Sequence, residues 1–116
     1  MSVNRVILVG HVGQKPTIRY VGNKAVATFS LATSDRAKTV DGVEIPERTE
    51  WHNLVMWDKA AEIAERYIDK GNKLYVEGKL RTRTWQDNNA LKHTITEIIV
   101  ENFEILSRSS QSQQAQ

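Results

Sequence analysis

The sequence contains no cysteine, only two prolines, and no long apolar run among its 116 residues. Without cysteine, a disulfide framework, a thiolate metal site and a thiol nucleophile are all excluded. A membrane-spanning helix needs about 20 predominantly apolar residues, and none of the apolar runs approaches that length. Residues 1–4 lead straight into an apolar run and do not resemble a secretory leader. These absences, with a length suited to one domain, predict a cytoplasmic protein without a membrane segment.

Motifs for catalysis and cofactor binding are also scarce. The three histidines, His11, His52 and His93, are far apart in sequence and form no H-x-H or H-E-x-x-H motif. A metal site assembled from distant residues stays open, but solvated or interface histidines are favoured. The stretch GHVG, residues 10–13, lacks a P-loop lysine and G-x-G-x-x-G spacing, and no G-x-S-x-G elbow is present. We therefore expect no cofactor, no metal and no enzymatic activity.

Hydrophobic patterning predicts a mainly β protein with one helix. The helix is expected over residues 58–72, with Asp58 at its N-cap and Gly71 at its C-terminal stop. The polar stretch 34–50, with a turn at Asp41-Gly42, predicts a two-stranded arm. A second hairpin tip is expected at 86–89. The five main strands are expected at residues 3–13, 25–33, 50–57, 73–85 and 91–106.

This order of elements predicts an all-β fold, a five-stranded OB-fold barrel with one α-helix between the third and fourth strands and long hairpin arms. Other small barrels share the pattern. The domain is expected to span residues 1–106. Residues 107–116 are rich in serine and glutamine and nearly lack apolar side chains, so this segment is expected to be a disordered tail.

The predicted fourth strand carries an unusual face. Lys79, Arg81, Arg83 and Trp85 are spaced two residues apart, so their side chains share one side of the strand. Three cations followed by an indole suit a polyanion with unpaired bases, because cations neutralise phosphates and an indole stacks on a base. The alternative is an exposed hairpin that charge keeps soluble, with Trp85 packed against a neighbour.

The predicted third strand has the same geometry. Trp51 and Trp57 lie on one side of it, together with Asn53 and Val55, and His52 lies on the other side. Buried tryptophans are common, so this pair alone does not distinguish packing from binding. Tryptophans on two strands in a basic setting favour base stacking.

Several stretches closely resemble the single-stranded DNA-binding proteins of bacteria. They are VNRVILVGHVGQKPTIRY, ATFSLATS, TEWHNLVMWDKAAEIAERYIDKGNKLYVEGKLRTRTW and TEIIVENFEIL, and the resemblance covers residues 1–106. It implies a homotetramer that wraps single-stranded DNA, with Trp51, Trp57 and Trp85 stacking on bases and His52 at a subunit interface. Arg5 and Arg19, in the first of these stretches, join Lys79, Arg81 and Arg83 as expected DNA contacts.

The sequence departs from this family at two places. Many members carry a further tryptophan in the arm, where Ala37 stands here, and many end in an acidic tip that closes with phenylalanine. Residues 107–116 offer one charge, Arg108, and no aromatic, so recruitment of replication and repair proteins through such a tip is not expected.

The resemblance implies a non-catalytic, largely sequence-independent single-stranded DNA-binding protein of the bacterial cytoplasm and nucleoid. It would protect and organise exposed strands in replication, recombination and repair. Two alternatives remain at this point: a primosomal OB-fold protein, a relative that is usually dimeric, and a small nuclease.

Overall fold

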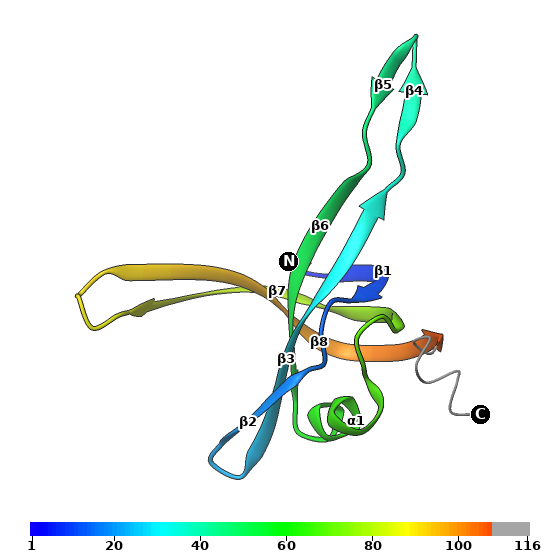
Figure 1. Cartoon of the computed structure of the whole chain (residues 1–116). Helices are drawn as coiled ribbons and strands as arrows, with labels where there is room; N and C mark the ends of the chain where they lie inside the picture. Colours follow the sequence, from blue (N-terminus) through cyan, green and yellow to red (C-terminus); the bar gives the residue numbers. More distant parts are fainter. Residues whose placement is uncertain (108–116) are drawn as a thin grey trace.

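The structure is a computed structural model that describes residues 1–107. Five strands form a closed ring in the order β1-β7-β8-β6-β3, and β3 pairs with β1 to close it (Figure 1). Only β6 and β8 pair in parallel within this ring. The ring strands are β1 (Val6–Val12), β3 (Lys24–Asp35), β6 (Arg48–Trp57), β7 (Lys73–Gln86) and β8 (Lys92–Ser107). The predicted OB-fold order is confirmed, because α1 (Lys59–Tyr67) lies between the third and fourth ring strands.

The core fills the ring with alternate residues of each strand. Leu54 and Met56 of β6 point inward, as do Leu74 and Val76 of β7, and each is at most 1% exposed. Each such side chain contributes about 1.5–3 kcal/mol through burial of its apolar surface. Closure of the ring also needs a residue without a side chain, since a Cβ atom at Gly10 would collide with the carbonyl of Ala32. On each strand, the residues between these inward-facing positions point outward.

The helix is shorter than predicted. It ends at Tyr67 with Ile68 as its C-cap, four residues before Gly71, which has a positive φ of 89° in the following turn. Asp58 is the N-cap residue as expected, but its side chain makes no capping hydrogen bond. Ile68 is buried in the core, together with Ala61 and Ala64 of α1. Burial of Ile68 in an extended conformation explains why the helical pattern in the sequence continues past the true end.

Three hairpins extend from the ring (Figure 1). One is the arm of β4 (Lys38–Val40) and β5 (Val43–Ile45), where Asp41 and Gly42 both have positive φ, as a tight two-residue hairpin turn requires. The second is formed by the outer halves of β7 and β8. The third joins the short strand β2 (Thr17–Val21) to β3 at a turn that contains Gly22, which has a positive φ of 61°. The predicted tail begins at 107, whereas β8 includes Ser107, and the rest of that tail lies outside the described residues.

Candidate nucleic-acid interface

The pairing of the strands brings the predicted residues of β6 and β7 onto one face of the sheet. Val55 of β6 is paired with Ile99 of β8, and Ile99 is paired with Lys79 of β7. Directly paired residues point to the same side of a sheet, and alternate residues along a strand do the same. The outward face that carries Trp51 and Trp57 therefore continues across β8 to the face that carries Lys79, Arg81, Arg83 and Trp85.

Arg19 joins this outward face from the other side. It is paired with Val26 of β3, and Val26 is paired with Trp57 of β6. Val26 is fully buried although it points away from the core cluster, which shows that neighbouring side chains cover it. Arg19 and Trp57 thus flank one apolar position on the same surface.

The three indoles are accessible rather than core residues. Trp51 is 59% exposed, Trp85 43% and Trp57 37%. Trp51 lies over Gly13, where a Cβ atom would come within 2.5 Å of Trp51 Cζ3 and 2.8 Å of Ser30 Oγ. The absence of a side chain at Gly13 therefore leaves room for the Trp51 ring to lie against the backbone. Each indole retains enough open surface for a planar ligand to stack on it.

The cations of β7 differ in their availability to a ligand, because one of them is paired with an acidic residue of β8. Arg83 Nε donates a hydrogen bond of 3.0 Å to Glu97 Oε1, and the Glu97 side chain is only 9% exposed. Lys79 and Arg81 have no ion pair within the described residues. The sequence pattern did not distinguish the three cations. Glu97 stands 14 residues beyond Arg83, so nothing in the local sequence indicated the contact.

Arg5 is also engaged by a carboxylate. Its guanidinium lies 2.6 Å from Glu77 Oε2, and the Tyr75 hydroxyl donates a hydrogen bond to the other oxygen of Glu77. The Tyr75 hydrogen bond is the largest cause that lowers the pKa of Glu77, and Arg5 lowers it further. This arrangement keeps Glu77 ionised and makes Arg5 a less available cation than Arg19, Lys79 or Arg81.

His52 lies on the other face of β6, as predicted. It is half-buried, and its Nε2 and Thr33 Oγ1 are hydrogen-bonded at 2.8 Å. Its paired residue is Leu31, a core residue of β3. The structure therefore separates His52 from the face that carries the indoles.

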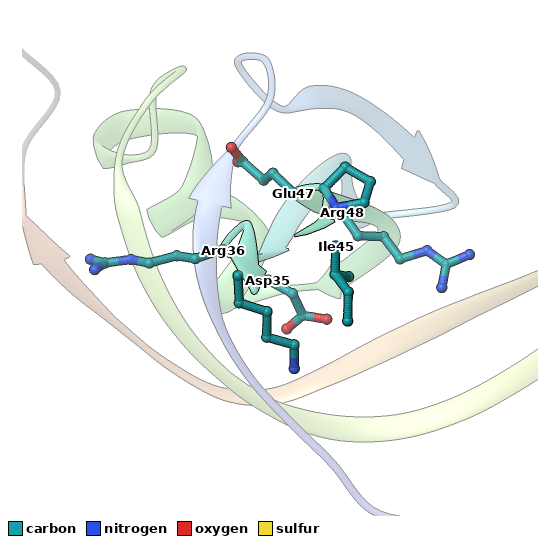
Figure 2. Close-up of a pocket in the computed structure, with 7 residues that line it drawn as sticks. Asp35, Arg36, Ile45, Glu47 and Arg48 are labelled. Carbon is teal, nitrogen blue, oxygen red and sulfur yellow. The ribbon is translucent and has the colours of Figure 1, made fainter. Parts of the chain in front are cut away.

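The base of the β4–β5 arm adds cations that the sequence analysis did not single out. A hollow there is shown in Figure 2, where Arg36 and Arg48 extend in different directions and Asp35 and Glu47 lie near them. Ala37 is exposed between β3 and β4. The polar composition of residues 34–50 was the available signal for these cations, although the segment as a whole carries more carboxylates than cations. The hollow is lined by Asp35, Arg36, Lys38, Ile45, Pro46, Glu47 and Arg48.

Residues 1–107 contain no group of three or more histidine, aspartate or glutamate side chains placed to hold a metal ion. Within the same residues, no helix is long and apolar enough to cross a membrane.

A closed five-stranded ring with this topology defines an OB-fold protein, a class whose second and third ring strands commonly present the ligand-binding face. The model of the single-strand binding protein family matches residues 3–106. A single-stranded DNA-binding protein of Bacteroides thetaiotaomicron is 55% identical over 109 residues, which cover 92% of this chain and 68% of that protein. The chain therefore belongs to the single-strand binding protein family.

A solved structure agrees with this assignment. The structure described as Plasmodium falciparum SSB complex with ssDNA superposes with a TM-score of 0.83 at 36% identity. The match covers 92% of this chain and 97% of the other.

Proposed function

We propose that this chain binds single-stranded DNA with little sequence preference and protects exposed strands during DNA replication, recombination and repair. The observation that carries the proposal is the single outward face on which Trp51, Trp57 and Trp85 are exposed beside Lys79 and Arg81. Every base has a flat face, so stacking on indoles tolerates any sequence, and the cations follow the phosphates. The single-strand binding protein family is non-catalytic, and the chain is not an enzyme.

The residues have distinct roles in this proposal. The three indoles stack on bases, with Trp51 and Trp85 offering the larger open surfaces. Lys79, Arg81 and Arg19 contact phosphates directly. Arg83 and Arg5 contribute less charge, because Glu97 and Glu77 already neutralise part of it. We place this activity on bacterial DNA, since the 55% identical relative is bacterial.

We further propose that the chain assembles as a homotetramer. The outward face of β1 supports this, because Ile7 and Val9 are 55% and 46% exposed there, so that about half of each residue is left uncovered by the described chain. Burial of such a strand against a second copy would remove apolar surface from water. His52 is the proposed subunit contact on β6.

Titration of the intrinsic tryptophan fluorescence tests the binding proposal. Oligothymidine should quench the emission, and a duplex of equal length should bind far more weakly because its base faces are hidden. The logarithm of the affinity should fall with the logarithm of salt concentration, with a slope of roughly −0.7 per neutralised phosphate. Equal affinity for duplex and single strand at moderate salt would contradict the proposal, as would metal-dependent nicking of the DNA.

A further inference from the structure

Trp85 belongs to a small cluster at the outer end of the β7–β8 hairpin. Its ring is stacked on the imidazole of His93, with ring centroids 5.2 Å apart and an angle of 25° between the planes. The two residues are directly paired across β7 and β8. Arg83 Cζ also lies over the Trp85 ring, 5.2 Å from its centroid. The indole is thus held by two neighbours and still has 43% of its surface exposed.

The imidazole is itself fixed by the hairpin turn. His93 Nε2–H donates a hydrogen bond of 2.7 Å to Asp87 Oδ2. The other carboxylate oxygen of Asp87 accepts hydrogen bonds from the backbone N–H groups of Asn89 and Leu91. The bond from His93 is the largest cause that lowers the pKa of Asp87. One side chain therefore links the turn backbone to the ring that contacts Trp85.

We propose that His93, anchored by Asp87, is a positioning residue that holds the Trp85 indole in the orientation in which it stacks on a base. This inference rests on the proposed binding of single-stranded DNA. Trp85 stands one residue from the end of β7, at a hairpin tip far from the core, where a side chain without neighbours samples several rotamers. The contact with His93 restricts that freedom before DNA arrives, so less conformational entropy is lost on binding.

The arrangement also limits where a base can stack. The imidazole covers part of the indole in the free protein, so a base must use the part of the ring that His93 leaves open. Base, indole and imidazole would then form a short stack that ends on the hairpin turn. His93 contributes to binding through Trp85 and not through its own contact with DNA.

The experiment compares His93→Ala, His93→Phe and a control, Thr94→Ala, in the full chain. Thr94 adjoins His93 on β8 but points to the opposite face, where it is hydrogen-bonded to Thr84. Acrylamide quenching is measured on the free protein with Trp51 and Trp57 replaced by phenylalanine, so that Trp85 is the only indole. His93→Ala should increase this quenching, whereas His93→Phe and Thr94→Ala should leave it close to its original value.

Binding is measured with dye-labelled oligothymidine in the chain that retains all three tryptophans. His93→Ala should weaken binding roughly two- to tenfold, the effect expected for one side chain that must be ordered anew. His93→Phe should restore most of this loss, because a phenyl ring can also stack on the indole. In a Trp85→Ala background, His93→Ala should change the affinity by less than about twofold, since the residue through which it acts is gone.

Two results would overturn the inference. Unchanged acrylamide quenching of Trp85 in His93→Ala would show that His93 does not hold the indole. A loss of affinity that persists in the Trp85→Ala background would show that His93 contacts DNA itself. If the unmodified chain failed to bind oligothymidine, the proposed function would fail, while the quenching of the free protein would still test the contact between His93 and Trp85.

Discussion

Trp51 and Trp57 occupy the same face of one strand but have different surroundings. Trp51 is the more exposed and lies over Gly13, a position without a side chain to bury. Trp57 is paired with Val26, which is fully buried on this face, so the Trp57 ring has apolar surface to cover. Trp51 should therefore contribute mainly to binding, whereas Trp57 should contribute to both binding and packing.

Trp51→Ala should weaken binding of oligothymidine by about 1–3 kcal/mol, the usual contribution of one stacked base, and leave the thermal midpoint nearly unchanged. Trp57→Ala should weaken binding and also lower the free energy of unfolding by about 1–3 kcal/mol, because it uncovers apolar surface around Val26. Calorimetry and fluorescence anisotropy measure the two effects. If Trp51→Ala melted early and bound normally, its indole would be a packing residue and not a binding platform.

At the scale of the element, β7 combines core and binding functions along one strand. Its first half places Leu74 and Val76 in the core, and its second half, which begins in the ring and continues beyond it, carries Lys79, Arg81 and Arg83 on the outward face. β8 supplies the partner for one of these cations, since Glu97 is held by Arg83. The basic character of the strand is therefore strongest at Lys79 and Arg81.

Arg81→Ala should reduce the steepness of the salt dependence by about 0.7, the effect of one lost phosphate contact, with little change in stability. Arg83→Ala should have a smaller effect on the salt dependence but lower the free energy of unfolding by about 1–2 kcal/mol, because the nearly buried Glu97 carboxylate would be left without its partner. Arg66→Ala on α1 is the matched control for loss of one positive charge. Equal salt slopes for the Arg81 and Arg83 variants would contradict this division of roles.

At the scale of the whole molecule, one ring presents only a short track for DNA. The indoles of β6 and β7 lie on one face, while the exposed Ile7 and Val9 lie on the outward face of β1. Two apolar side chains beside each other on a strand favour contact with another copy of the chain. Assembly would extend the track by joining the binding faces of several copies.

Light scattering at micromolar concentration should give the mass of a tetramer. Ile7→Asp should weaken assembly, because it places a charge in the proposed contact, and His52→Glu should do the same on β6. Circular dichroism of the dissociated variants should retain the β spectrum, since neither residue belongs to the buried core cluster. A monomer would contradict the assembly proposal, and a stable dimer would favour the primosomal type of assembly.

The sequence alone determined the elements and the faces of individual strands. Successive side chains of a strand point to opposite sides. Trp51 and Trp57 therefore share one side of their strand, and Arg81 and Trp85 share one side of theirs, whatever the rest of the fold. The Asp41-Gly42 turn was equally local, since its positive φ angles suit those residue types. The end of α1 was missed because Ile68 keeps the apolar spacing of the helix while it is buried in extended chain.

Only the tertiary structure decided which residues meet across strands. Glu97 beside Arg83, His93 on Trp85 and Gly13 beneath Trp51 depend on registers between separate segments of the chain. The register of β7 with β8 also shifts between Glu77 and Gly78, where an extra residue of β8 interrupts the pairing. Such a shift changes every later partner, and it follows from closure of the ring around the core, which no local pattern of residues records.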